Sequence, residues 1–234
     1  MVPDAIAEVR GRTDTVLLAF SIGKDSIGAW LELRKHFCVV PFYQFYVPNL
    51  AFIERSLRYY ERFFGCEAPM VQLPHRKFWL WLQESAFQCP ASSEALDDAD
   101  IPEYRVYDIA DWLREDLNLP DAYLAISLRS SDNLSRRIQI KQRGAVNHVR
   151  KTFFPIADWD DARLAREIEA AGVRLPVDYR IFPRSFEGLR NEFLAPIAKH
   201  FPEDYARILA WFPWAGLELE RHRMFGRGLR VQEA

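Results

Sequence analysis

A short apolar run followed at once by small and polar residues is the feature that most limits the fold of this chain. The run "TVLLAF" (15–20) has the length of a buried strand and contains β-branched residues. It leads into "SIGKDS" (21–26), and residues 25–37 then show the apolar spacing of a helix. A strand, a tight loop and a helix in this order are typical of a parallel sheet covered by helices.

The same alternation continues along the chain. Further strands are expected at 38–47, 70–74 and 122–128, and an extended segment at 152–159. Residues 88–107 are acidic and polar and are expected to form a loop or lid, and a loop and then a helix should follow residue 128. Helices are expected at 75–85, 108–119, 160–172 and from a cap at Asn49 to Phe64.

This pattern predicts an α/β fold: a three-layer, mostly parallel, twisted sheet with helices on both faces. We expect one α/β domain over residues 1–175, and a helical C-terminal extension, 176–234, packed on it. Ligands of such sheets bind at the carboxyl ends of the strands, near a switch in strand order. The turn at 21–26 has a favoured position for such a site.

The composition is that of an ordinary globular protein, with 49% apolar and 27% charged residues among 234. No apolar run has the length of a membrane span, so no membrane association is expected. The first residues, "MVPDAIAEVRGRTD", include early acids and no continuous apolar stretch, unlike a secretory signal. A cytoplasmic location is the resulting expectation.

The three cysteines, Cys38, Cys66 and Cys89, are far apart and form no C-x-x-C pair. A structural zinc site and an iron–sulfur cluster are therefore not expected, and the thiols should be reduced and mostly buried.

The net charge of −2 hides an asymmetry. Between residues 129 and 151, seven Lys and Arg stand against one acid, Asp132, so this segment carries +6 and the rest of the chain −8. A basic island of this kind favours an anionic ligand at one face. The alternative is a solvated helix face whose acidic partners come from neighbouring elements, and charge alone does not choose between them.

The loop "SIGKDS" has the residues that an anion site needs. Gly23 permits a tight turn, the following helix start carries partial positive charge, and Lys24, Ser21 and Ser26 add donors. Neither the Walker A pattern nor G-x-G-x-x-G is present. The alternative is an ordinary strand–helix turn with Asp25 as the N-cap.

The loop resembles S-G-G-x-D-S, the pyrophosphate loop of the PP-loop ATP pyrophosphatases and their sulfonucleotide-reductase relatives. Ser21, Gly23, Asp25 and Ser26 match that pattern. Ile22 stands in place of the first glycine. Lys24 is typical of the phosphoadenosine-phosphosulfate (PAPS) reductase branch.

A second stretch, "SLRSSDNLSR" (127–136), resembles the family's G-I-R-x-x-E-S-x-x-R. Arg129 and Arg136 match directly, Asp132 stands for the Glu, Asn133 for the Ser, and Ser127 for the Gly. Arg forks suit phosphate or sulfate oxygens, and the alternative is that these arginines pair with surface acids.

A third stretch, "PIADWDDARL" (155–164), resembles P-[IL]-x-D-W-[ST]-x-x-D-[VL]. It supplies Pro155, Ile156, Asp158 and Trp159, whereas Arg163 stands at the second Asp. Asp158 and Trp159 have an alternative reading as a helix-entry cap and a core tryptophan. Together the three stretches cover about residues 15–165 and imply an adenine nucleotide alpha hydrolase-like fold.

Two activities occur in the family. ATP pyrophosphatases bind Mg-ATP, let an oxygen attack the α-phosphorus and release pyrophosphate, whereas the reductases use a cysteine near the C-terminus. No cysteine follows Cys89 here, and sulfur chemistry needs a thiolate, so reduction by that route is not expected. The resemblance therefore implies ATP or a PAPS-like nucleotide, with Mg²⁺, cleavage at the α-phosphate and activation of an acceptor.

The acceptor is unknown, and nucleic acid is a candidate because relatives take part in nucleic-acid thiolation and DNA modification. The arginines of "RHRMFGRGLR" (221–230) would suit such a partner as a basic tail, and Trp211, Phe212 and Trp214 either stack bases or pack a helix. Two alternatives remain: a sulfonucleotide-binding relative without the catalytic cysteine, and a non-catalytic nucleotide-binding subunit of a larger assembly with a protein partner or further copies of itself.

The resemblance also implies roles for single residues. Lys24, Asp25 and Arg129 are the catalytic candidates, and Asp25 either orders the loop or holds a magnesium-bound water. Tyr46, at the end of the second strand, would border the adenosine. The full set of nucleotide-binding candidates is Ser21, Ile22, Gly23, Lys24, Asp25, Ser26, Tyr46, Arg129, Asp132, Arg136 and Arg137.

Overall fold

The computed structural model describes residues 5–97, 99–182 and 184–225. The chain forms two compact units, each built from separate segments. The first, here called the sheet unit, comprises Met1–Gln44, Tyr59–Leu73 and Tyr104–Pro176. The second, here called the helical unit, comprises Phe45–Arg58, Pro74–Glu103 and Val177–Ala234. The last division falls beside the expected boundary at 175, but 45–58 and 74–103 belong with the C-terminal segment.

The sheet unit contains a six-stranded sheet in the order β3-β2-β1-β4-β6-β5. β1 pairs in parallel with β2 and with β4, and β4 pairs in parallel with β6. Only β5, antiparallel to β6, departs from this direction among the pairings described. The expected mostly parallel α/β sheet is thus confirmed. The strands are β1 (Thr15–Ala19), β2 (Cys38–Phe45), β3 (Val71–Pro74), β4 (Tyr123–Ala125), β5 (Val146–Asn147) and β6 (Thr152–Phe153).

The order of strands reverses beside β1. The chain adds β2 and β3 on one side of β1, and then places β4 on its other side. The switch therefore lies between β1 and β4, where connections leave in opposite directions and a crevice can form at the carboxyl ends. The segments that follow these two strands are the loop at 21–23 and residues 126–133.

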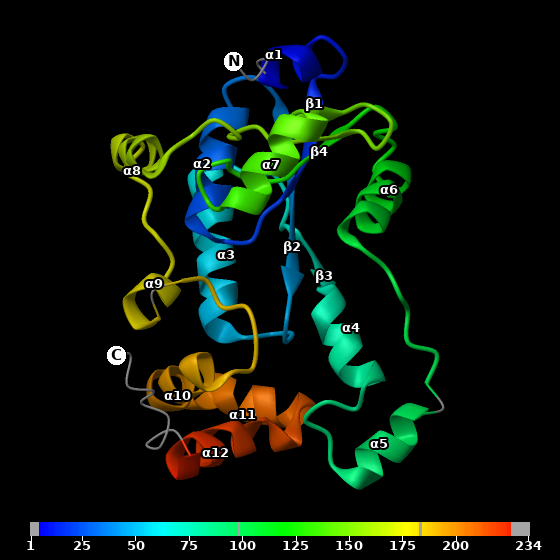
Figure 1. The fold of residues 1–234 in the computed structure, drawn as a ribbon, viewed down its shortest axis with the longest axis vertical. Coiled ribbons are helices and arrows are strands. Elements are labelled where there is room, and N and C mark those ends of the chain that lie inside the picture. Colours follow the sequence, from blue (N-terminus) through cyan, green and yellow to red (C-terminus); the bar gives the residue numbers. More distant parts are fainter. Residues whose placement is uncertain (1–4, 98, 183, 226–234) are drawn as a thin grey trace. The chain divides into compact units, whose positions relative to one another are not determined.

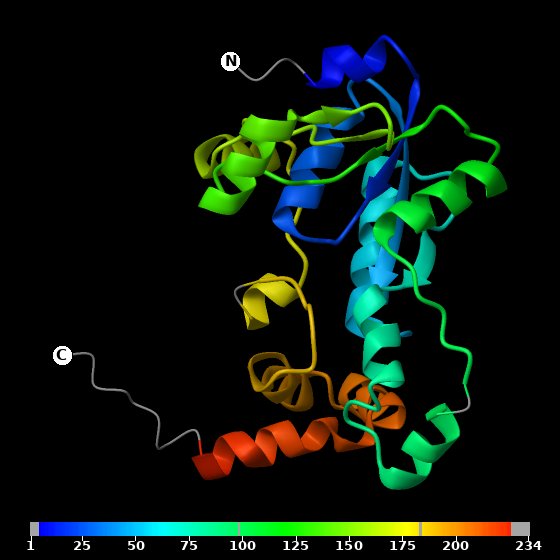
Figure 2. The same cartoon turned by 45° about the vertical axis from the view of Figure 1, so that its right-hand side comes forward.

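Helices cover both faces of this sheet, as Figures 1 and 2 show for α2 and α6. Leu17 and Leu124 form a core cluster with Leu113 of α6. Phe20, three positions from Leu17 and so on the opposite face, packs against Trp30 of α2 with ring centroids 4.9 Å apart. The helices with residues in this unit are α1 (Ala5–Arg10), α2 (Lys24–Leu33), α3 (Ala51–Phe64, from Tyr59), α6 (Val106–Asp116), α7 (Leu134–Arg143) and α8 (Asp161–Ala170).

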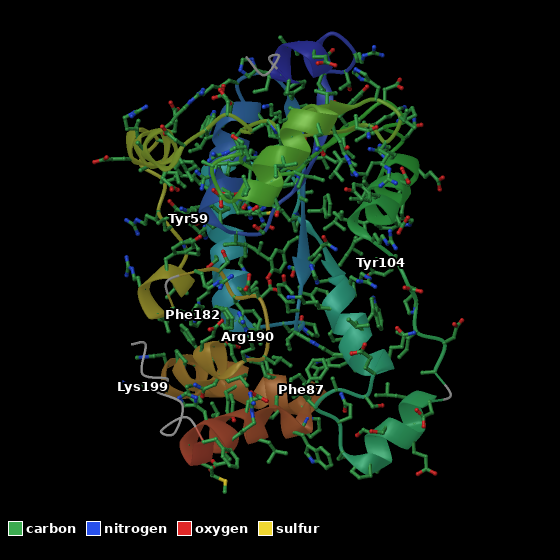
Figure 3. All side chains as sticks on the ribbon, viewed as in Figure 1. Tyr59, Phe87, Tyr104, Phe182, Arg190 and Lys199 are labelled. Atoms are coloured by element: carbon green, nitrogen blue, oxygen red, sulfur yellow. The ribbon has the colours of Figure 1, made fainter. Side chains whose placement is uncertain are left out.

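A glycine sets the approach of α8 to α2. A Cβ added at Gly28 would lie 2.3 Å from Leu164 Cδ1 and 3.3 Å from the ring of Trp159. Any larger residue would require the side chain of Leu164, or the two helices, to shift. The segment after α8 is held to α3 by reciprocal hydrogen bonds, because Tyr60 Oη donates to Arg174 O and Arg174 N donates to Tyr59 Oη, each at 2.8 Å (Tyr59 is labelled in Figure 3).

The helical unit has an aromatic core. Phe52, in the first turn of α3, stacks on Phe201 at 5.1 Å and meets Phe182 edge to face at 6.4 Å. The buried carboxylate of Asp204 caps α3, accepting from the N–H groups of Ala51 at 2.7 Å and Phe52 at 3.1 Å. The helices here are α4 (Arg76–Gln83), α5 (Pro90–Asp97), α9 (Asp178–Ile181), α10 (Asn191–His200), α11 (Pro202–Trp211), the 3₁₀ helix η1 (Pro213–Gly216) and α12 (Leu217–Phe225).

Several local expectations were wrong. Residues 88–107, expected as a loop or lid, contain α5 and the start of α6. α5 has no buried residue, so no apolar periodicity marked it. Within 152–159 only Thr152–Phe153 is a strand, and a turn follows. α1 and the two-residue β5 were not anticipated, because such short elements leave no periodic signal.

Two further expectations need correction. The thiols are not mostly buried, since Cys38 is exposed at the first residue of β2 and the other two cysteines are partly exposed. The expected basic tail begins as part of α12, up to residue 225, and 226–230 lie outside the described residues. Of the aromatic residues near the end, Phe212 is fully buried, whereas Trp211 and Trp214 are 44% and 45% exposed. Within the described ranges no helix is long and apolar enough to cross a bilayer.

Candidate functional site

The loop after β1 is ordered by its own serines. Ser26 Oγ donates to Gly23 O at 2.8 Å, Ser21 Oγ lies 3.3 Å from Ser26 Oγ, and Gly23 N donates to Ser21 Oγ at 3.4 Å. Gly23 is the N-cap of α2, and no side chain caps it. The alternative reading of an Asp N-cap is therefore wrong, because Asp25 lies inside the first turn. An uncapped helix start behind a glycine is suited to an anion.

Ile22 has a backbone conformation that glycine adopts far more readily than isoleucine. Its φ is +63°, in the left-handed region, and its side chain is 1% exposed. A β-branched residue is strongly disfavoured there, because Cβ crowds the backbone. Such conformations persist only where surrounding structure enforces them, and they concentrate at functional sites. The backbone of the loop thus follows a path that favours glycine, although isoleucine stands at this position.

Arg129 is the centre of the site. Its side chain is 3% exposed, and its Nε lies 2.7 Å from Asp25 Oδ1. Its Nη2 lies 2.9 Å from Asp132 Oδ1 and 3.0 Å from Asp161 Oδ1. Its Nη1 donates to Ser131 Oγ at 3.2 Å. These contacts bring together the first turn of α2, the segment after β4 and the start of α8.

Two more cations complete an ion-paired cluster. Lys24 Nζ lies 3.0 Å from Asp161 Oδ1, and Arg136 Nη1 pairs with Asp132 Oδ2. The cluster therefore has equal numbers of cations and carboxylates and a formal charge of zero; its members are Lys24, Arg129, Arg136, Asp25, Asp132 and Asp161. Arg129 and Arg136 are thus paired with acids, but their shared partner Asp132 is only 13% exposed and is not the surface acid of the alternative reading.

Arg137 lies outside the cluster. It is exposed, and its Nε makes one long contact to Ser130 O at 3.4 Å. Asn133 caps α7 by accepting from Arg136 N at 2.9 Å, so it has a structural role.

The environment shifts the pKa values of these groups in different directions. Burial raises the pKa of Asp25 even though Arg129 faces it. Hydrogen bonds from Lys24 and Arg129 lower the pKa of Asp161. Burial works against the charge of Arg129, but Asp25 and Asp132 outweigh it and raise its pKa. The guanidinium therefore keeps its charge, whereas burial disfavours the charged form of Asp25.

Three buried polar atoms at this place lack a hydrogen bond within the described part of the chain: Asp25 Oδ1, Ser127 Oγ and Arg129 Nε. The first and third are ion-paired at 2.7 Å but poorly aligned for hydrogen bonding. Buried polar groups in folded proteins are nearly always satisfied by protein or water. Ser127 Oγ, just after β4, is thus the one of the three with neither a hydrogen bond nor an ion pair among the described residues.

The basic island of the sequence is not one face of the molecule. Arg129 and Arg136 follow the carboxyl end of β4, whereas Arg150 and Lys151 precede the amino end of β6. Because β4 and β6 run parallel, the two groups lie at opposite ends of these strands. Lys151 Nζ binds Pro120 O at 2.6 Å and lies 3.1 Å from Asp121. The seven basic residues of this segment therefore do not form one basic face, and an anionic ligand beside Arg129 and Arg136 stays a prediction.

The surroundings of Asp25 bear on its predicted metal role. Over the ranges that the structure describes, no three His, Cys, Asp or Glu side chains are grouped to hold a metal ion. Asp25 Oδ1 faces the guanidinium of Arg129 at 2.7 Å, and a divalent cation bound there would lie against that positive charge. The residues fit the loop-ordering role of Asp25 and do not fit direct coordination through Oδ1, and the magnesium-bound water at Asp25 stays a prediction.

Tyr46 belongs to the helical unit, whereas the loop belongs to the sheet unit. Its ring lies 4.4 Å from that of His75 and 6.0 Å from that of Phe186. Burial raises the pKa of its hydroxyl to about 12. Its role beside an adenosine stays a prediction.

The third stretch contributes a residue that the sequence did not single out. Asp158 pairs with Arg163 at 3.2 Å, and Trp159 is buried in the core. Asp160 caps α8 by accepting from Arg163 N at 2.7 Å. Asp161, the next residue, is the one that reaches Arg129 and Lys24. The sequence "DWDD" does not show which of these acids faces the loop, because that depends on the residue at which α8 begins.

Searches against protein-family models and against curated proteins found no match to this chain.

Proposed function

We propose that this chain is a PAPS reductase-like PP-loop enzyme that binds an adenine nucleotide, cleaves ATP at the α-phosphate and releases pyrophosphate to activate an acceptor. One observation carries the proposal: the first turn of α2, directly after the glycine-containing loop, meets the buried Arg129 after β4 at the switch in strand order. That is where sheets of this type bind their ligands. The adenine nucleotide alpha hydrolase-like superfamily is part of the same proposal.

The position of each residue indicates the role that it would have in binding the phosphates. The backbone of Gly23, the hydroxyl of Ser26 and the ammonium of Lys24 would hold the leaving pyrophosphate, as the start of a helix holds an anion. Arg129 would neutralise charge on phosphate oxygens, and its planar fork suits two of them at once. Asp25 and Asp132 hold that fork in place. Catalysis of this kind consists mainly of positioning and charge neutralisation.

Mg²⁺ would accompany the nucleotide and offset the charge of its phosphates, while retaining water as its usual ligands. Because Asp25 does not fit as a direct ligand, we assign this chain no step through the ion. The chain supplies the anion cradle and the fixed cations.

A second candidate is a protein that binds a sulfonucleotide without reducing it. Cys38 lies opposite Thr15 at the amino end of the parallel strands β1 and β2, whereas the loop follows their carboxyl ends. Cys89 belongs to the helical unit. The cysteine at the opposite end of the sheet favours binding over thiol chemistry in this candidate. A non-catalytic subunit would use the same cradle, and nucleic acid stays the candidate acceptor of the enzyme.

Calorimetric titration with Mg-ATP and, separately, with adenosine 3′,5′-bisphosphate tests the proposal. Preference for Mg-ATP supports the pyrophosphatase function, and preference for the bisphosphate supports the second candidate. Product analysis then decides the position of cleavage, since AMP or an adenylated acceptor with pyrophosphate indicates the α-phosphate, and ADP with phosphate contradicts it. Binding of neither nucleotide overturns the proposal.

A matched pair of lysine variants locates the binding. Lys24→Gln should weaken nucleotide binding by about tenfold or more, because a charge-assisted hydrogen bond is lost. Lys35→Gln removes the same charge just beyond the other end of α2, where Lys35 pairs with Glu32 and Glu167. Its binding should match that of the wild type. Equal effects of the two variants would contradict a site at the loop.

A further inference from the structure

One carboxylate oxygen bridges the two cations that the proposed function assigns to phosphate. Asp161 Oδ1 lies 3.0 Å from Lys24 Nζ and 3.0 Å from Arg129 Nη2. These cations come from different elements, the start of α2 and the segment after β4. Both distances are those of hydrogen bonds from a charged nitrogen to an anionic oxygen. The two donors thus define the position of an oxyanion, and the chain itself supplies the oxygen.

The three carboxylates of the cluster differ in how firmly they are built in. The side chains of Asp132 and Asp25 are 13% and 31% exposed, whereas that of Asp161 is 76% exposed. Within the described residues Asp161 has no side-chain hydrogen bond or ion pair besides these two cations. Moving the Asp161 carboxylate into water therefore breaks contacts that solvent already weakens. It leaves no buried charge without a partner. Displacing Asp25 or Asp132 would leave the buried Arg129 without its nearest partners.

We propose that Asp161 Oδ1 occupies the position of a phosphate or sulfate oxygen of the nucleotide, and that the ligand binds by displacing this carboxylate. The inference rests on the proposed function and adds to it a defined oxyanion position between Lys24 and Arg129. Asp161 is a competitor of the ligand. The exchange is non-covalent: one anionic oxygen leaves two donors and another takes them.

For a competitor, the effect of a substitution on ligand affinity is opposite to that expected for an ordinary binding residue. Removing the charge of a competitor strengthens ligand binding, whereas removing a group that positions the cations or holds a metal weakens it. Exposed ion pairs are worth little, so the gain should be about two- to fivefold in affinity. The gain should shrink at high ionic strength, because the contact that is removed is screened.

The chain offers a closely matched control. Asp161→Asn removes the competing charge and keeps the shape of the side chain. Asp160→Asn removes the same charge one residue earlier, and Asn is as good an N-cap for α8 as Asp. Asp160 is not paired with Lys24 or Arg129 in the described structure. Any general effect of a less negative surface should therefore appear equally in both variants.

Each protein would be titrated with pyrophosphate and with adenosine 3′,5′-bisphosphate in a chelating buffer, and then with Mg-ATP. Asp161→Asn should bind the metal-free probes about two- to fivefold more tightly than Asp160→Asn and the wild type. Weaker or unchanged binding by Asp161→Asn overturns the inference. A loss confined to the Mg-ATP titration would instead assign Asp161 to the metal, and would also overturn it.

The two proposals fail in different ways. If the wild type binds nucleotide and Asp161→Asn binds no more tightly, the competitor role of Asp161 is wrong. The proposed function is not contradicted by that result. If the wild type and both variants bind neither nucleotide nor pyrophosphate, both proposals fall. Thermal unfolding of each variant checks that the folded fraction is the same in every titration.

Discussion

Arg129 Nε lies 2.7 Å from Asp25 Oδ1, and this contact joins the segment after β4 to the first turn of α2. The two residues are more than a hundred positions apart in the chain, yet each follows a strand of the same parallel sheet. The guanidinium is almost fully buried, so its charge has to be compensated locally. The charge of Arg129 is therefore compensated by carboxylates of the chain itself.

The first prediction concerns the two sides of this pair. Arg129→Gln should lower the free energy of unfolding by about 3–5 kcal/mol, because it leaves Asp25 and Asp132 without their buried partner. Asp25→Asn should cost clearly less. Burial raises the pKa of Asp25 above its ordinary 3.8, so its contribution to stability is present below pH 3.8 and is lost as pH rises through the folded-state value.

Urea unfolding at pH 7 measures both variants, and the double variant Asp25→Asn/Arg129→Gln serves as the control. Its destabilisation should be smaller than the sum of the two single values, since the same interaction is removed twice. Equal losses for the two single variants would contradict the assignment of the unfavourable charge to Asp25.

The second prediction tests the backbone of the loop. Ile22→Ala and Ile22→Gly both remove a buried side chain and should both destabilise the protein. At φ +63°, however, the glycine variant avoids a crowding of Cβ that the alanine variant retains. Ile22→Gly should therefore be the more stable of the two by about 1 kcal/mol.

The same pair of substitutions at Ile27 is the control. Ile27 is fully buried inside α2, where Gly should be less stable than Ala by about 1 kcal/mol. Chemical denaturation of the four variants gives both differences. If Ile22→Ala proved more stable than Ile22→Gly, the result would argue against the left-handed backbone.

The third prediction concerns the packing of α8 on α2. Gly28→Ala should destabilise the protein by about 1–3 kcal/mol, because the added Cβ meets Leu164 Cδ1 at 2.3 Å. This direction is opposite to the usual one, since Gly to Ala within a helix normally stabilises. In the double variant with Leu164→Ala, the Gly28→Ala change should cost less than it does alone. A cost that does not depend on Leu164 would show that the clash lies elsewhere.

The fourth prediction is a pH dependence in the helical unit. His75 caps α4 through Nδ1, which accepts from Lys77 N at 3.0 Å. Burial, with Lys77 and Arg76 nearby, lowers its pKa from 6.5 to about 4. The unfolded chain thus binds this proton more readily, so stability is present above pH 6.5 and declines as pH falls from 6.5 to about 4.

His75→Asn keeps a strong helix cap and removes the titration. Its free energy of unfolding should therefore fall less than that of the wild type between pH 6.5 and 4. Denaturation at several pH values measures the difference, to which other groups contribute equally in both proteins. Parallel curves would show that His75 is not held neutral by the fold.

Local patterns were enough for the elements around the site. The apolar run before Gly23 and the spacing after it predicted β1 and α2, since both depend on neighbouring residues. The meeting of the loop with Arg129 was also predictable, because parallel strands bring their carboxyl ends to one edge. The carboxylate partners of Lys24 and Arg129 were not predictable in this way. Which of Asp158, Asp160 and Asp161 reaches Arg129 depends on where α8 begins and how closely Gly28 lets it approach.

The sequence by itself determined the alternation of strands and helices and the edge of the sheet that carries the loop, because both follow from short-range apolar patterns. Only the tertiary structure decided how charge is distributed. It separated Arg129 and Arg136 from Arg150 and Lys151 by the length of parallel strands, and it enclosed Arg129 among carboxylates from three segments. Charges interact through space, so their order along the chain does not set their partners.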